Sequence, residues 1–196
     1  MQYRKDRKGN DISLLGFGCM RFEGSGTGEY FQKANDQVME AIRQGINYFD
    51  TAYVYKNNEK VLGRILAENN CRDQIYIATK LPQYMVRSVA QAEKIFNQEL
   101  ELLQTDHIDY YLMHMLNDLA SWNRLKAMGL EDWIKEKMVS GKIRNIGFSY
   151  HGNTENFKPV VDVFDWDFCQ IQYNYWMKTF RPEKRVFYTR QKKDFQ

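Results

Sequence analysis

A regular alternation of apolar, strand-like segments with amphipathic, helix-like segments constrains this sequence more than any other feature. Short and nearly continuous apolar runs begin at Ile46, Gln74, Ile108, Ile143 and Phe168, at a spacing of roughly 25 to 35 residues. The segments between them carry apolar residues at helical spacing. Apolar strands that are each followed by a helix are typical of a parallel sheet covered by helices. The pattern therefore predicts an α/β fold.

An earlier apolar run, Ile12–Met20 (ISLLGFGCM), adds a strand before these five. The sequence thus predicts six strands, over residues 12–20, 46–50, 74–80, 108–115, 143–149 and 168–173. Helices are expected over residues 31–44, 59–68, 89–103, 121–140 and 154–161. Residues 1–11 are expected to form a short hairpin that turns at Lys8-Gly9-Asn10.

Length and composition are those of a globular domain. The 196 residues are enough for one domain with a sizeable core. No run approaches the roughly 18 apolar residues that a membrane span needs, so no membrane partner is expected. The three cysteines (Cys19, Cys71 and Cys169) are far apart and form no CxxC pair, which favours a reduced, cytoplasmic protein.

The net charge of +3 comes from the end of the chain. Residues 176–196 contain seven basic and two acidic side chains, which leaves 21 basic and 23 acidic residues in the first 175 positions. The body of the protein is therefore mildly acidic, and the charge does not indicate a nucleic-acid partner. The run of charge in the tail is typical of a solvated segment.

Polar residues occur where five of the predicted strands end: Asp50, Lys80, His114, Ser149 and Gln172. One polar residue at a strand end would carry little information. Five in succession suggest a common rim, and this favours a (β/α) barrel over an open, doubly wound sheet.

The side chains expected at this rim suit proton transfer to a carbonyl oxygen. Asp50 would keep Lys80 charged, and Lys80 near Tyr55 would lower the pKa of the phenol from about 10. Tyr55 could then act as a general acid, while His114 donates a hydrogen bond to the same oxygen. None of these groups is a good covalent nucleophile, so the electrons would have to come from a cofactor.

Each of these residues taken alone has a simpler structural explanation. Asp50 could cap a helix, Lys80 could be a solvated strand end, and a single histidine in an apolar strand usually belongs to the core. Asp50 and His114 could be imagined as metal ligands, but no third ligand occurs at suitable spacing. The ordered series of strand ends is what favours a catalytic site.

Several motifs resemble those of the aldo-keto reductase family. NYFDTAYVYKNNEKVLG at 47–63 is similar to the family signature, in which DTAxxY is followed by ExxLG. LGFGCMR at 15–21, IATKLP at 77–82 and YYLMHM at 110–115 resemble three of its strand motifs. KIRNIGFSYHG at 142–152 and CQIQYN at 169–174 resemble two more, so that the likeness covers about residues 1–175.

The resemblance implies a fold, a cofactor and a set of site residues. The fold would be a TIM (β/α)8-type barrel, of which about six of the eight βα units lie in residues 1–175. The reaction would be reversible hydride transfer between NADP(H) and a small aldehyde or ketone. Tyr55 would be the general acid, and Asp50, Lys80 and His114 would complete a tetrad. The residues expected at the cofactor are Met20, Arg21, Asp50, Ser149, Tyr150 and Gln172.

Two departures from the family pattern lead to further expectations. Tyr150 stands where asparagine is commoner, as in a branch whose longer members carry a C-terminal ferredoxin-like domain, which this sequence does not show. Residues 176–196 show no strand pattern, which suggests a truncated or frame-shifted reading. An incomplete barrel would have open edges, low stability, a tendency to self-associate and weak or absent NADPH affinity, which could leave the chain inactive. The alternative function is a non-catalytic, cofactor-sensing subunit with the same fold.

Overall fold

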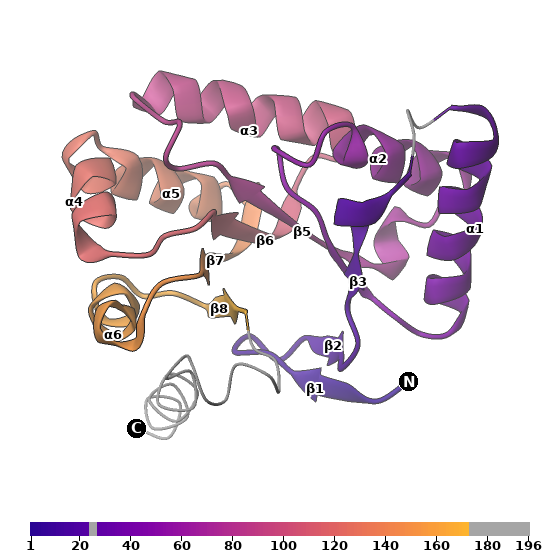
Figure 1. Cartoon of the computed structure of the whole chain (residues 1–196), viewed down its shortest axis with the longest axis horizontal. Coiled ribbons are helices and arrows are strands. Elements are labelled where there is room, and N and C mark those ends of the chain that lie inside the picture. The colour runs from indigo at the N-terminus through magenta and orange to yellow at the C-terminus, as the bar shows by residue number, and fades with distance from the viewer. Residues whose placement is uncertain (24–26, 173–196) are drawn as a thin grey trace.

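The computed structural model describes residues 1–23 and 27–172, which form a curved parallel sheet with helices on its outer face (Figure 1). The order of the strands in the sheet is β3-β4-β5-β6-β7-β8, the same as their order along the chain. They are β3 (Phe17–Gly18), β4 (Tyr48–Asp50), β5 (Tyr76–Leu81), β6 (Ile108–Met113), β7 (Ile143–Tyr150) and β8 (Phe168–Ile171). All five pairings are parallel, which confirms the predicted parallel α/β architecture and gives it the form of a half-barrel. The predicted tail at 176–196 lies outside the described residues.

Six helices connect these strands and cover one side of the sheet. They are α1 (Gly28–Arg43), α2 (Asn58–Glu68), α3 (Val89–Leu103), α4 (Leu119–Ala127), α5 (Leu130–Val139) and α6 (Thr154–Asp162). Their apolar stripes pack on the outward side chains of the strands, such as Phe49, Ile77 and Tyr111. None of the described helices has the length and apolar character needed to cross a membrane.

The first predicted strand is wrong as a single element. Its beginning forms β2 (Asp11–Ser13), which pairs antiparallel with β1 (Tyr3–Lys5), and only β3 joins the parallel sheet. A 3₁₀ turn over Cys19–Arg21 (η1) follows β3. The chain leaves the hairpin at Ser13, whose hydroxyl donates to the Leu15 carbonyl 2.8 Å away, while the Asn47 side chain accepts a hydrogen bond from the Ser13 amide. Apolar content alone did not reveal this break.

The predicted helix over 121–140 is also wrong as a continuous helix. The chain breaks between α4 and α5 at Gly129, which has φ 88°. Side chains disfavour this left-handed conformation and glycine does not, so Gly129 allows the second helix to start in a new direction. The predicted hairpin at the N-terminus is confirmed by the β1–β2 pairing.

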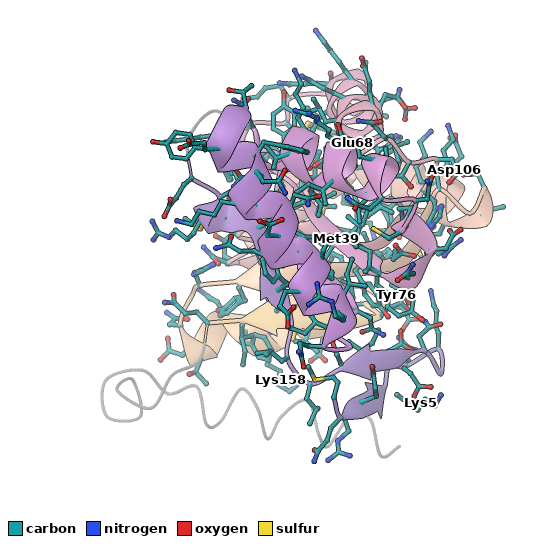
Figure 2. The ribbon with its side chains drawn as sticks, turned by 90° about the vertical axis from the view of Figure 1, so that its right-hand side faces the viewer. Lys5, Met39, Glu68, Tyr76, Asp106 and Lys158 are labelled. Carbon is teal, nitrogen blue, oxygen red and sulfur yellow. The ribbon has the colours of Figure 1, made fainter. Side chains whose placement is uncertain are left out.

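The inner face of the sheet is filled by aromatic rings and by the hairpin. Ala78, Tyr110 and Leu112 form a small buried cluster together with the partly buried Tyr48 and Phe168. The Tyr110 hydroxyl donates to Asp6 in the turn of the hairpin. Figure 2 shows the hairpin, labelled at Lys5, below α1, which is labelled at Met39. The hairpin therefore covers the amino-terminal end of the sheet, and the carboxyl ends of the strands remain for a site.

Candidate functional site

Asp50, Tyr55, Lys80 and His114 come from three neighbouring strands and the segments that follow them. Asp50 is the last residue of β4, Lys80 lies near the end of β5, and His114 follows β6 directly. Tyr55 lies in the loop between β4 and α2, where its amide donates to the Ala52 carbonyl at 2.9 Å. Because parallel strands end at the same edge, the fold brings the four side chains together at that edge.

Lys80 and Asp50 form a buried ion pair. The Lys80 Nζ lies 2.7 Å from Asp50 Oδ1, 2.6 Å from Asp50 Oδ2 and 2.6 Å from the Thr51 carbonyl oxygen. The Lys80 side chain is 2% exposed, so burial lowers its pKa, and the Asp50 carboxylate opposes that effect. Three acceptors satisfy the three N–H donors of an ammonium group, which is the arrangement that a charged lysine requires.

Tyr55 lies beside this pair, and its hydroxyl makes no hydrogen bond to the residues that the structure describes. The centre of its ring is 5.0 Å from Lys80 Nζ and 5.9 Å from the centre of the His114 ring, which is nearly perpendicular to it at 84°. Burial, and then the charges of Asp50 and Tyr84, raise the pKa of Tyr55 to about 12. The expected net lowering of this pKa by Lys80 is therefore wrong, because burial disfavours the phenolate most and Asp50 offsets part of the charge of the ammonium.

His114 is a buried, neutral imidazole. Its ring is 6% exposed and its Nδ1 is buried without a hydrogen-bond partner in the described part of the chain. Its backbone amide donates to the Leu81 carbonyl at 2.9 Å, which links the ends of β5 and β6. Burial, and then the positive charges of Lys80 and His151, lower the pKa of His114 to about 4. At neutral pH the ring can therefore donate one hydrogen bond without carrying a charge.

Ser149 faces the same side of the sheet from β7, and its neighbour in register on β8 is Gln170. The Ser149 Oγ accepts a hydrogen bond from the Met115 amide at 2.8 Å, which leaves its O–H free to donate. The Gln170 Oε1 is buried and has no partner among the described residues. By contrast, Gln172 lies beyond the end of β8, exposed, with its Oε1 3.2 Å from His151 Nδ1.

Gln170 is thus a residue that reasoning from the sequence missed. Ser149 and Gln170 are paired across β7 and β8, and residues of one strand alternate between its two faces. Strand alternation counted from Phe168, which packs inside the half-barrel, would have identified Gln170 as inward-facing.

A match to a protein-family model shows which family this chain belongs to. Residues 14–196 match the model of the Aldo/keto reductase family. The chain belongs to the aldo/keto reductase family.

The sequence similarity to individual aldo/keto reductases supports this assignment. Aldo-keto reductase YhdN of Bacillus subtilis is 30% identical over 151 residues, which cover 72% of this chain and 44% of that protein. Glycerol 2-dehydrogenase (NADP(+)) of Saccharomyces cerevisiae is 33% identical over 164 residues, which cover 69% of this chain and 50% of that enzyme. The chain therefore spans about half the length of these curated relatives.

A solved structure of a putative aldo-keto reductase from Pseudomonas aeruginosa superimposes with a TM-score of 0.77. The sequences are 25% identical, and the match covers 96% of this chain and 72% of the other. The half-barrel thus has the strand arrangement of aldo/keto reductases, which confirms the predicted TIM-barrel type of fold.

The other residues predicted near a cofactor occupy different environments. Met20 and Arg21 are exposed on η1, just beyond β3, at the same edge of the sheet as Asp50. Tyr150 is only 4% exposed, since its ring packs against Phe157 and its hydroxyl donates to the Asn153 carbonyl. This placement favours a packing role for Tyr150 over the predicted cofactor contact.

Two further residues that the sequence analysis missed hold the loop after β5. Arg124 on α4 donates to the carbonyl oxygens of Val86 and Gln83, each at 2.8 Å, and Gln83 Nε2 donates to the Met115 carbonyl at 3.2 Å. Met115 itself has φ 54°, a conformation rare for a side chain of its size. These contacts fix the segment next to His114.

No cluster of three metal-binding side chains occurs among residues 1–23 and 27–172.

Proposed function

We propose that this chain carries the active site of an NADP(H)-dependent reductase of aldehydes or ketones, with Tyr55 as the general acid. The observation that carries the proposal is the Tyr55 ring beside Lys80 and a neutral His114, with a hydroxyl that has no hydrogen-bond partner in the described part of the chain. A phenol whose pKa is about 12 keeps its proton at neutral pH, and so it can act as an acid.

The residues present fit a nicotinamide cofactor. Ser149 and Gln170 offer a hydroxyl and a buried, unpaired amide oxygen on adjacent inward positions, which suits a carboxamide group. Met20 and Arg21 are exposed at the same edge, where an arginine side chain can contact a phosphate. A bound NADPH would supply the hydride that reduces the carbonyl carbon. Glycerol 2-dehydrogenase, a relative of this chain, is named for NADP(+).

Each of the four side chains has its own role in the proposed reaction. His114 donates a hydrogen bond to the substrate carbonyl oxygen and orients it. Tyr55 gives its proton to that oxygen as negative charge develops there. Lys80, whose Nζ lies 5.0 Å from the centre of the Tyr55 ring, stabilises the phenolate that remains, and Asp50 holds the ammonium in place.

The test compares Tyr55→Phe with Tyr53→Phe. Tyr53 is two residues away, and its hydroxyl contacts Gln98 rather than the site. With NADPH and 4-nitrobenzaldehyde as probes, we expect Tyr55→Phe to lose roughly 10²- to 10⁴-fold in kcat and Tyr53→Phe to remain near wild type. Undiminished turnover in Tyr55→Phe would refute the assigned acid. NADPH binding without turnover in the wild type would support the non-catalytic, cofactor-sensing alternative instead.

A further inference from the structure

Four buried polar residues lie on the opposite face of β5 from the site. They are Glu59 on α2, Thr79 on β5, Glu99 on α3 and Tyr111 on β6, and none is more than 2% exposed. Carboxyl groups are rarely buried to this extent unless they are paired. The mechanism proposed above uses none of the four.

Hydrogen bonds join these residues across four elements. The Thr79 hydroxyl donates to Glu59 Oε1 at 2.5 Å, and the Tyr111 hydroxyl donates to Glu99 Oε2 at 2.6 Å. Thr79 also lies near the Glu99 carboxyl, whose Oε1 is buried without a hydrogen-bond partner in the described residues. A hydroxyl group has a single hydrogen, so when Thr79 donates to Glu59, it can only accept from Glu99.

The charge balance requires a proton in this cluster. The nearest ammonium, Lys80, gives its hydrogen bonds to Asp50 and Thr51 on the other face. Two unpaired buried carboxylates would cost several kcal/mol in desolvation. Burial raises the pKa of Glu59 to about 7, and burial together with the charge of Glu59 raises that of Glu99 well above its usual range. Glu99, which is fully buried and whose Oε1 has no hydrogen-bond partner in the described residues, is therefore the better suited of the two to hold the proton.

Three of the four residues also lie next to the proposed catalytic groups in the sequence. Glu59 is in the first turn of α2, just after Tyr55, and the Asn58 amide donates to the Tyr55 carbonyl at 3.0 Å. Thr79 immediately precedes Lys80, and Tyr111 precedes His114 on the same strand and its extension. The Glu59–Thr79 contact thus fixes the segments that carry Tyr55 and Lys80 relative to each other. The contacts of Glu99 with Tyr111 and Thr79 join the strands that carry His114 and Lys80 through α3.

We propose that Glu59, Thr79, Glu99 and Tyr111 form one positioning network, which holds a shared proton and fixes the relative positions of Tyr55, Lys80 and His114. The positioning part of the proposal rests on the proposed function. The shared proton does not, because it follows from burial and from the number of donors.

The proton is tested without any assay of activity. Glu99→Gln mimics the protonated acid, since its amide can donate to Thr79 and accept from Tyr111. At pH 7 the infrared spectrum of the wild type should contain the C=O band of a protonated carboxyl group. This band should be weaker in Glu99→Gln, where Glu59 is the remaining buried carboxyl group of the network. Glu101→Gln, on the exposed side of α3, is the matched control and should retain the band.

Stability gives a second readout, with a defined sign. A raised pKa in the folded state means that the contribution of Glu99 is fully present below about 4.5 and is lost as the pH rises through the folded value. The charged and titratable groups that face the cluster are Glu59, Lys80, Glu93 and Tyr111. The melting temperature of Glu99→Gln relative to wild type should therefore rise between pH 5 and pH 8.5. A constant difference, or no infrared band, would overturn the shared proton.

Positioning is tested at Thr79. Thr79→Val keeps the shape of the side chain but lacks the hydroxyl, and Thr79→Ser retains the hydroxyl. With NADPH and 4-nitrobenzaldehyde, we expect Thr79→Val to lose about tenfold in kcat with little change in the KM for NADPH, and Thr79→Ser to recover most of the loss. Unchanged kcat in Thr79→Val would overturn the positioning role and leave the proposed function intact.

If the wild type shows no turnover, the proposed function fails, and positioning is read by NMR instead. The ring resonances of Tyr55 and His114 should then shift in Thr79→Val and not in Thr79→Ser. Ring resonances that stay in place would overturn the network as a positioning device. Circular dichroism of each variant identifies any that do not fold, and Thr79→Ser and Glu99→Gln are the mildest substitutions of the set.

Discussion

The ion pair between Lys80 and Asp50 influences the pKa of the neighbouring Tyr55 phenol. A lone ammonium 5.0 Å from the ring would favour the phenolate. Here both carboxylate oxygens of Asp50 contact that ammonium, so the carboxylate offsets part of its positive charge. Burial then decides, and Tyr55 remains a protonated acid with a pKa of about 12. The sequence correctly predicted that these residues are neighbours. It could not show whether the pKa of Tyr55 would rise or fall.

His114 leads to a prediction about stability in acid. Its pKa is about 4 in the folded protein, against about 6.5 in an unfolded chain, because burial and Lys80 disfavour the charged ring. A lowered pKa contributes stability that is present above pH 6.5 and is lost as the pH falls through about 4. His114→Gln should therefore lose less stability than wild type between pH 7 and pH 4.5, by about 2 kcal/mol in urea unfolding.

His151→Gln provides the comparison for this measurement, because His151 is exposed and is the smallest of the three causes that lower the pKa of His114. This variant should stay close to the wild-type curve across the same range of pH. An NMR titration of the His114 ring gives a direct check. A midpoint at or above 6.5 would contradict the prediction.

Among the secondary-structure elements, periodicity predicted the existence and type of most helices and strands. Periodicity failed where a local hydrogen bond or a backbone angle ends an element. Examples are Ser13 in the first predicted strand and Gly129 in the predicted long helix. Periodicity also chose Gln172 over Gln170, because the end of β8 depends on its pairing with β7. Gln83 and Arg124 donate hydrogen bonds to backbone carbonyl oxygens that are distant in the sequence. Such contacts produce no periodic pattern in the sequence.

The packing of α2 on α3 leads to a prediction at Gly63. A Cβ atom at this position would lie 2.3 Å from the Leu102 carbonyl oxygen and 2.7 Å from Leu103 Cα. Gly63→Ala gains up to about 1 kcal/mol in helix propensity, but overpacking against backbone costs about 1–3 kcal/mol. We expect a net loss of about 1–2 kcal/mol in the free energy of unfolding, measured with urea.

Lys60→Ala, on the exposed side of the same helix, separates propensity from packing. This variant should change the free energy of unfolding by less than about 0.5 kcal/mol. If Gly63→Ala proved as stable as wild type, α2 and α3 would have to be able to move apart without cost.

For the molecule as a whole, the sheet is closed at neither side within the described residues. Helices cover its outer face (Figure 1). The hairpin and several tyrosine rings fill its inner face. In the described part of the chain, β3 and β8 each pair with only one neighbour. An edge strand presents unpaired N–H and C=O groups that can pair with another chain.

We therefore expect this chain to self-associate through its edge strands. Sedimentation at increasing protein concentration should show a rising average mass. Ile171→Lys, at the end of β8, should reduce it because a charge on an edge strand opposes pairing. Val139→Lys removes a side chain that is 90% exposed at the end of α5, far in sequence from either edge, and should leave the association unchanged. An equal effect of both substitutions would assign the association to general apolar contact, and a monomer at every concentration would exclude it.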